Sequence, residues 1–144
     1  MQLVYVTRKV KQKTMLRKAE EKDIARIAEI IVFTKRHTYR DIFKNDEVSF
    51  NVIQVLSEAD SFKKPHALDN MYVYDDGIVK GLIHIEGTEI KELYVDHFFQ
   101  SQGIGARLIE FAKETHYADH LWAIEKNTRA IAFYEAHGFQ LTGE

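Results

Sequence analysis

The stretch "FFQSQGIGARLIEFA", residues 98–112, leads from two aromatic residues through a polar, glycine-bearing turn into an apolar-periodic segment. After Gly103, apolar residues recur at i, i+4, i+7 and i+8, the spacing of one face of a helix. They are Ile104, Leu108, Phe111 and Ala112. The strand-like run "ELYV" ends just upstream, near Asp96. The stretch therefore predicts a turn from a strand into the N-terminus of an amphipathic helix.

Three short, alternating, β-branched or aromatic segments precede this turn, at residues 71–75, 78–86 and 89–95. Asp76-Gly77 lies between the first two, and this pair predicts a hairpin with a type I′ turn, which needs positive φ at its centre. Gly87-Thr88 separates the next two in the same way. The middle of the chain is therefore predicted to be an antiparallel meander of three strands.

Helical spacing dominates on both sides of the meander. A short strand followed by a helix is predicted from residue 15 to about 34, a second helix over 46–56 and a loop over 57–70. Downstream we expect a strand at "LWAI" (121–124), a helix over 127–137 that Gly138 ends, and a last strand at "FQL" (139–141). This order predicts an α/β (α+β) fold, in which helices flank both faces of a mixed, mostly antiparallel central sheet.

Composition sets limits on function. The chain has 144 residues, a formal charge of −2, seven histidines and no cysteine. A single soluble domain is expected, and the charge gives no reason to expect nucleic acid or a membrane as partner. No segment resembles a signal peptide or a membrane span, so a cytoplasmic location is expected. Without cysteine, disulfides and thiol nucleophiles are excluded, and because His116 and His120 lack the intervening glutamate of a zinc motif, no metal is expected.

The two glycines before the predicted helix allow two interpretations. The first turn of a helix has unpaired N–H groups and a positive dipole end, so it attracts phosphate. Gly103 and Gly105 are what a pyrophosphate cradle would need, but on spacing alone an ordinary strand-to-helix turn is the favoured interpretation. The spacing matches neither a Walker loop nor a dinucleotide-binding fingerprint.

A resemblance favours the first interpretation. "LYVDHFFQSQGIGARLI" resembles the acyl-CoA binding signature Q/R-x-x-G-x-G/A of the GCN5-related N-acetyltransferase (GNAT) family, with Gln100, Gly103 and Gly105 at its three fixed positions. "NTRAIAFYEAHGF" resembles the family's second signature. The matching residues are Asn127, Ala130, Phe133, Tyr134, Gly138 and Phe139. The resemblance extends over about residues 15–142.

The resemblance implies acetyl-CoA as cosubstrate and implies which residues hold it. In the family the pyrophosphate binds backbone amides of the glycine loop, and the pantetheine arm pairs with the end of the fourth strand, which splays from its neighbour. A backbone N–H near Val95 would polarise the thioester carbonyl. The implied cofactor-binding residues are Leu93, Tyr94, Val95, Gln100, Gln102, Gly103, Ile104, Gly105, Ala106 and Asn127. Asn127 is also a good helix N-cap, and both roles are compatible.

Two catalytic residues are proposed. Tyr134 lies where the family carries the acid that protonates the departing thiolate, although its pattern alone fits a core aromatic. Glu89 is the candidate general base, because strand alternation would place it on the same face as Leu93 and Val95. Glu86 and Glu92 are rivals, with Glu92 on the opposite parity. Glu89 can equally be a solvated carboxylate at a hairpin end.

The expected function is an acetyl-CoA-dependent N-acetyltransferase that moves acetyl to a primary amine by direct transfer in a ternary complex, since no cysteine can carry the acetyl group. The acceptor is a small molecule, a polyamine or a peptide amine, and its site is expected between residues 34–43, with Tyr39 and Phe43, and the meander. Asp41, Asp46 and Glu47 could attract a polyamine or simply be solvated. The alternative is a non-catalytic acyl-CoA sensor or interaction module on the same fold. A different phosphate ligand is disfavoured by the second signature.

The sequence departs from the family pattern at three places. His97 stands where the family often has proline, and the seventh strand that usually follows the segment matching "GFQLTGE" (138–144) is not expected here. Residues 1–14 precede the single domain predicted for 15–144, as an extra strand or as a disordered extension. We hypothesise that "LVYVT" occupies an open sheet edge in its own chain or in a neighbour's, which makes a homodimer possible.

Overall fold

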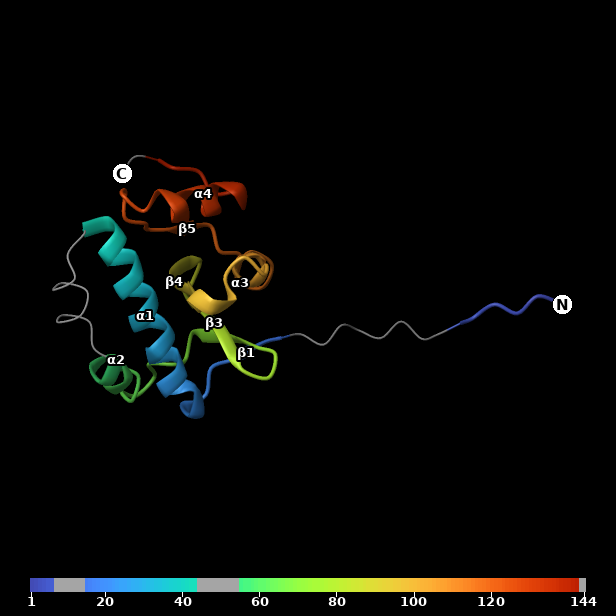
Figure 1. Ribbon diagram of the computed structural model, residues 1–144, viewed down its shortest axis with the longest axis horizontal. Helices are drawn as coiled ribbons and strands as arrows, with labels where there is room; N and C mark the ends of the chain where they lie inside the picture. Colours follow the sequence, from blue (N-terminus) through green and yellow to red (C-terminus); the bar gives the residue numbers. More distant parts are fainter. Residues whose placement is uncertain (7–14, 44–54, 143–144) are drawn as a thin grey trace.

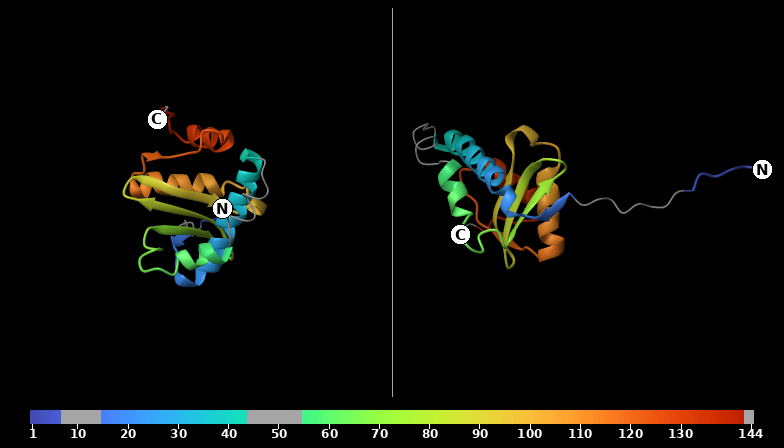
Figure 2. Two further views of the ribbon diagram at one scale, coloured as in Figure 1. Left: turned by 90° about the vertical axis from the view of Figure 1, so that its left-hand side faces the viewer. Right: turned by 90° about the horizontal axis from the view of Figure 1, so that it is seen from below.

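The computed structural model describes residues 1–6, 15–43 and 55–142, without the side chains of 39–43 and 55–56. It contains one five-stranded sheet with helices on both faces (Figures 1 and 2). The strands are β1 (Leu16–Lys18), β2 (Met71–Asp75), β3 (Val79–Glu86), β4 (Glu89–Val95) and β5 (His120–Leu121). The α-helices are α1 (Ile24–Phe43), α2 (Val55–Ser61), α3 (Ile104–His116) and α4 (Thr128–Ala136), and the short 3-10 helices are η1 (Glu21–Asp23) and η3 (His97–Phe99).

The strands lie in sequence order across the sheet, and every neighbouring pair is antiparallel except β4 and β5. The predicted fold class, a mixed and mostly antiparallel sheet between helices, is confirmed. Parallel pairing of β4 with β5 requires a crossover, and α3 provides it on one face of the sheet. The turn into α3 therefore lies at the end of β4, as the sequence predicts.

The two hairpins differ from the predicted type I′ turns. Asp75 pairs with Val79, so the first loop has three residues, and Gly77 has φ +120° while its N–H donates to Asp75 Oδ1 at 2.9 Å. In the second hairpin Gly87 has φ +60°, but Thr88 has negative φ. Type I′ needs positive φ at both central residues, so the turn type was wrong, although the hairpins themselves are confirmed.

Apolar side chains form a core on each face of the sheet. On one face, α3 packs through Ile104, Leu108 and Ile109 against Ile83 and other strand residues. On the other face, α1 packs through Ile27, Ile30 and Ile31 on Met71, Val73 and Leu82. The helical spacing of these isoleucines and leucines is the reason that each helix buries one stripe. Both helices are thereby fixed relative to β4, which lies between them.

A bulge in β4 changes which residues share a face. His84 pairs with Glu92 and Ile85 pairs with Ile90, which leaves Lys91 as an extra residue. Strict alternation would place Glu92 on the face of Ile90. Instead, Leu93 packs with Ile90 on the α3 face, and beyond Lys91 the alternation is shifted by one residue. The parity argument that placed Glu89 with Leu93 and Val95 was therefore wrong.

Two segments outside the sheet also correct the sequence predictions. The loop expected over 57–70 begins as helix, because α2 runs to Ser61, and most of the helix expected over 46–56 lies outside the described residues. "FQL" forms no strand within the described residues. The N–H of Phe139 bonds the carbonyl of Tyr134 at 3.0 Å, and that of Gly138 bonds Glu135 at 3.2 Å. This pair of bonds is a Schellman ending of α4, with Gly138 at φ +95°, so the predicted stop is confirmed.

The N-terminal residues 1–6 have no helix or strand, extend away from the domain (Figure 1), and expose Leu3, Val4, Tyr5 and Val6. Pairing of this segment with an edge strand of its own chain is therefore not seen for these six residues. Pairing with a neighbouring chain stays a prediction. Among the described helices, none has the length and apolarity needed to span a membrane.

Candidate active site

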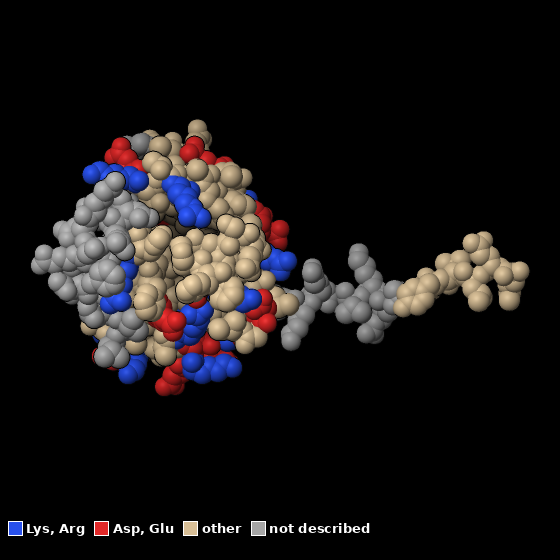
Figure 3. All heavy atoms as spheres, in the orientation of Figure 1, with Lys and Arg blue, Asp and Glu red and all other residues tan. Residues whose placement is uncertain are grey.

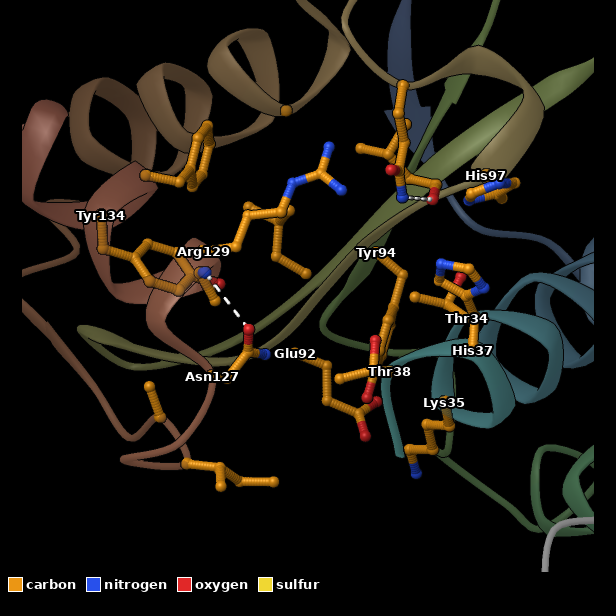
Figure 4. Close-up of a pocket in the computed structure, with 18 of the residues that line it drawn as sticks. Thr34, Lys35, His37, Thr38, Glu92, Tyr94, His97, Asn127, Arg129 and Tyr134 are labelled. Atoms are coloured by element: carbon orange, nitrogen blue, oxygen red, sulfur yellow. Dashed lines mark hydrogen bonds between the residues drawn. The ribbon is translucent and has the colours of Figure 1, made fainter. Parts of the chain in front are cut away.

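A cleft of about 780 Å³ lies between α1 on one side and α3 and α4 on the other. The second half of β4 and the segment after β5 also line it. Figure 3 shows the hollow on the surface, and Figure 4 shows the side chains that line it. All but two of the predicted site residues line this cleft.

The strands β4 and β5 separate within the cleft. They pair only at Glu89 with His120 and at Ile90 with Leu121. Beyond that point Leu93, Tyr94 and Val95 line the cleft from β4, and Trp122, Ala123 and Ile124 line it from the other side. The edge of β4 that β5 leaves is thus open to a ligand.

The hydrogen-bond pattern of β4 shows which backbone groups face this open edge. The N–H of Asp96 donates to the carbonyl of Lys80 at 2.8 Å. Because hydrogen-bonded and non-hydrogen-bonded pairs alternate in an antiparallel ladder, Tyr94 bonds β3, while Leu93 and Val95 direct their N–H and C=O groups away from it. One of these groups is already used, since Gln100 Nε2 donates to the carbonyl of Val95 at 3.3 Å. The N–H of Val95 therefore faces the cleft.

The N-terminus of α3 opens into the same cleft. Gly103 is its N-cap with φ +81°, and no side chain caps the helix there. Gly103, Ile104, Gly105 and Ala106 all line the cleft. The first amides of a helix have no intrahelical acceptor, so this end of α3 is a favourable place for phosphate oxygens.

The two glycines serve different purposes. A Cβ on Gly103 would meet nothing within 4 Å, so glycine is required there by the left-handed backbone. A Cβ on Gly105 would lie 3.3 Å from Cζ of Phe133, so the second glycine allows α4 to pack closely on α3. That both glycines clear space for an anion stays a prediction, since Gly103 and Gly105 both line the cleft.

The helix α4 and the two residues before it contribute a cap, a phenol and two cations. Asn127 caps α4 by accepting the N–H of Ala130 at 3.3 Å, and Figure 4 shows its amide nitrogen directed into the cleft. Burial raises the pKa of the Tyr134 phenol, because desolvation disfavours the phenolate. Lys126 and Arg129 also line the cleft, and Arg129 extends across it. The sequence analysis missed both cations, although Arg129 lies within the second signature and Lys126 directly before it.

Among the described residues, Glu92 is the carboxylate that lines the cleft. It extends from β4 toward Lys35 and Thr38 of α1 (Figure 4). Burial raises the pKa of Glu92, and Lys35 and His84 partly oppose this effect. A partly desolvated carboxylate with a raised pKa is a better proton acceptor near neutral pH than an exposed one.

Two predicted residues lie elsewhere. Glu89 is outside the cleft, where it pairs with Lys91 at 3.2 Å and with His120 at 3.6 Å beside the short β4–β5 contact. Gln102 is exposed and does not line the cleft. Glu89 was selected by an alternation that the bulge at Lys91 interrupts, so sequence spacing alone could not place it.

The α1 wall of the cleft is polar. Thr34, Lys35, His37 and Thr38 line it, and the ring of His37 lies 4.5 Å from that of His97, centroid to centroid. The side chains of residues 39–43 and 46–47, which the sequence analysis linked to the acceptor, lie outside the described part of the chain. Within the described residues, no group of three or more His, Asp or Glu side chains is placed to hold a metal ion.

Comparison with known proteins identifies the family. The model of the "Acetyltransferase (GNAT) domain" matches residues 67–141, just over half of the chain. The chain therefore belongs to the GNAT acetyltransferase family, as the two signatures predict. The matched range includes the meander, the glycine loop and α4.

Individual relatives match over shorter ranges. The Mycobacterium tuberculosis protein named "Probable N-acetyltransferase Rv2775" is 41% identical over 64 residues, which are 43% of this chain and 37% of that protein. The peptidyl-lysine N-acetyltransferase YjaB of Salmonella typhimurium is 33% identical over 63 residues, or 44% and 43% of the two chains. The chain thus matches well under half the length of these curated relatives.

A solved structure supports the fold over most of the chain. The structure of yncA from Salmonella typhimurium, which contains its cofactor acetyl-CoA, superposes with a TM-score of 0.63 at 19% identity. The superposition covers 89% of this chain and 80% of that one. At this identity the likeness establishes a shared fold.

Proposed function

We propose that this protein is an acetyl-CoA-dependent N-acetyltransferase that transfers acetyl directly to a primary amine in a ternary complex. The observation that carries the proposal is the separation of β4 from β5 next to the uncapped N-terminus of α3. Backbone groups of Leu93 and Val95, helix amides and a buried phenol thereby meet in one cleft. Membership of the family and the acetyl-CoA held by yncA support the same ligand.

The residues of the cleft fit acetyl-CoA part by part. The amides of Gly103 to Ala106 suit the pyrophosphate, and Lys126 and Arg129 add positive charge for phosphate groups. The open edge of β4 suits the amide groups of the pantetheine arm, which can pair with it like an added strand. Acetyl-CoA supplies the activated acetyl group, and the chain supplies the groups that orient it.

Three groups of the chain would perform the chemistry. The N–H of Val95 donates to the thioester oxygen, where negative charge develops, and one such donor is worth roughly 3–4 kcal/mol in other enzymes. As the amine nitrogen bonds the acetyl carbon and the carbon–sulfur bond breaks, Glu92 accepts the proton that the amine loses. Tyr134 donates its phenolic proton to the departing thiolate, which its raised pKa keeps available at neutral pH.

Glu92 replaces Glu89 as our candidate base. Glu92 lines the cleft and is partly desolvated, whereas Glu89 is outside the cleft and ion-paired. An acceptor ammonium of pKa about 10.4 is only about one thousandth neutral near pH 7.4. A base in the cleft that removes its proton therefore raises the fraction of reactive amine substantially.

The acceptor would enter along α1. The polar groups of Thr34, Thr38 and Glu92 suit an amine with hydrogen-bonding neighbours. YjaB of Salmonella typhimurium is named a peptidyl-lysine acetyltransferase, so a lysine side chain in a peptide is the first acceptor to test, followed by small amines and polyamines.

The experiment is a thiol-release assay with acetyl-CoA and a panel of amines, which contains lysine peptides, free amino acids and spermidine. Amine-dependent release that Tyr134→Phe slows without weakening acetyl-CoA binding would support an enzyme. A non-catalytic acyl-CoA sensor, the competing function, would bind acetyl-CoA, release no thiol with any amine, and be indifferent to Tyr134→Phe.

A further inference from the structure

A largely buried ion pair connects α1 to the segment between β4 and α3. Nη2 of Arg26 bonds Oδ2 of Asp96, and the two side chains are 21% and 11% exposed. The same guanidinium donates through Nε to the carbonyl of Val79 at 2.9 Å. Arg26 thus joins α1, β3 and the end of β4 at one point.

Asp96 also shapes the start of the segment between β4 and α3. Its Oδ1 accepts the N–H of Phe98 at 2.9 Å, and its carbonyl accepts the N–H of Phe99 at 2.9 Å. The two carboxylate oxygens therefore have separate partners: one caps η3, and the other bonds Arg26. A charged partner strengthens such a bond to about twice the neutral value.

The residues that follow adopt a conformation that local preference does not favour. Ser101 has φ +65°, although it carries a Cβ, and Gly103 has φ +81°. Left-handed backbone at a residue other than glycine persists where surrounding contacts hold it. Near these residues, contacts are made by Gln100 with Val95 and by His97 with His37 of α1.

We propose that Arg26 and Asp96 are positioning residues for the cofactor loop, which we define as residues 96–103. The ion pair holds the loop in the conformation that directs the first amides of α3 into the cleft. Neither residue lines the cleft, so each acts through the loop rather than by touching a ligand. The identity of the ligand as acetyl-CoA rests on the proposed function, but the ordering of the loop does not.

The chain offers a matched control at another edge of the sheet. Arg17 bonds Asp23 through Nη1 at 2.7 Å and Asp75 through Nη2 at 3.0 Å. The Asp23 side chain is 6% exposed, as buried as Asp96, and it also accepts a backbone N–H, from Glu20. None of these residues lines the cleft. Asp23→Asn should therefore destabilise the fold without reaching the cofactor loop.

The first test measures amide hydrogen exchange by NMR in the ligand-free protein, for wild type, Arg26→Met, Asp96→Asn and Asp23→Asn. We expect the amides of Phe98 and Phe99 to exchange about tenfold faster in the first two variants, the scale of one charge-assisted hydrogen bond. In Asp23→Asn they should stay at the wild-type rate. Asp96→Asn keeps an oxygen that can cap Phe98, so faster exchange there reports loss of the ion pair itself.

The second test measures acetyl-CoA affinity by calorimetry in the same four proteins. Arg26→Met and Asp96→Asn should each raise the Kd about tenfold, whereas Asp23→Asn should stay within twofold at an equal loss of Tm. Arg26→Lys, which keeps the charge, should recover part of the affinity, and it replaces Arg26→Met if that variant does not fold.

Wild-type exchange rates at Phe98 and Phe99 in the Arg26 and Asp96 variants would overturn the proposal. Equal acceleration in Asp23→Asn would also overturn it, because the effect would then be general destabilisation. A wild-type protein that does not bind acetyl-CoA would instead contradict the proposed function, and the exchange data would still decide whether Arg26 and Asp96 position the loop.

Discussion

The two sides of the cleft are built from different parts of the chain. The side that we propose binds acetyl-CoA, with the edge of β4, the start of α3 and α4, presents mainly backbone groups and short-range turns. The side that we propose binds the acceptor presents side chains, among them Thr34, Thr38 and His37 of α1 and Glu92 of β4. Backbone recognition needs particular φ values and caps, which leave a local pattern in the sequence, whereas the side-chain wall leaves no such pattern.

The largest effect on kcat is expected from a substitution of Glu92, on the proposed acceptor side. Glu92→Gln should lower kcat about a thousandfold while acetyl-CoA affinity stays near wild type, since general-base catalysis contributes roughly 10²–10⁴-fold. Glu89→Gln is the control, because Glu89 is outside the cleft, and its kcat should stay near wild type. Steady-state kinetics with the best amine decides between them, and a larger loss in Glu89→Gln would restore Glu89 as the base.

The same substitution should change stability with pH. Burial raises the pKa of folded Glu92 above its ordinary value, so folding disfavours its charged form. The resulting cost to stability is absent below the unfolded pKa of about 4.3 and fully present above the folded pKa. Glu92→Gln should therefore raise Tm at pH 7 and leave it unchanged near pH 4. A lower Tm at pH 7 would show that the carboxylate stabilises the fold instead.

The next effect is on the leaving-group side. Tyr134→Phe keeps the ring that packs against Phe133 and Phe139 but removes the acid, so kcat should fall about a hundredfold with an unchanged acetyl-CoA Kd. Stopped-flow or steady-state thiol release, with binding measured in parallel, checks this separation. A wild-type kcat in Tyr134→Phe would show that Tyr134 packs in the fold and does not act as the acid.

A smaller effect is expected from the backbone of the cofactor side. Gly103→Val forces a β-branched residue to φ +81°, which costs roughly 1–3 kcal/mol and should raise the acetyl-CoA Kd between about tenfold and a hundredfold. Gly77→Val imposes similar strain at φ +120° in a hairpin outside the cleft, so it should lower Tm and leave the Kd unchanged. Equal Kd values in both variants would show that the start of α3 does not hold the ligand.

The smallest effect concerns the cations that the sequence analysis missed. Arg129→Gln should raise the acetyl-CoA Kd about threefold at low ionic strength and less at 0.5 M salt, because a partly exposed charge is screened. Titrations at two salt concentrations measure this difference. A salt-independent loss would indicate a role in packing rather than charge.

Local signals in the sequence predicted much of this molecule. The meander, the glycine turn at Gly103 and the Asn127 cap each depend on residues that are neighbours in the chain, and the structure has all three. The bulge at Lys91 could not be predicted, because it is a property of the pairing between β3 and β4. Because of this extra residue, Glu92 and not Glu89 lines the cleft.

The ion pair between Arg26 and Asp96 could not be predicted from the sequence for a related reason. The two residues are 70 positions apart, and each alone is an ordinary charged residue on a helix or after a strand. Likewise, "FQL" alternates like a strand, but the amide of Phe139 is already used to end α4. The first case is a contact between distant parts of the chain, and in the second the local ending of α4 at Gly138 overrode the strand-like alternation.

The most direct test of the central claim is thermal unfolding of the wild-type protein with acetyl-CoA, with ATP and NAD as controls. Ligand at a hundred times its Kd stabilises a protein by about 2.7 kcal/mol, which a shift in Tm readily reveals. We expect acetyl-CoA to raise Tm and ATP and NAD to leave it nearly unchanged, because only acetyl-CoA has an arm that pairs with the open edge of β4. An unchanged Tm at saturating acetyl-CoA, or an equal rise with all three ligands, would contradict the account.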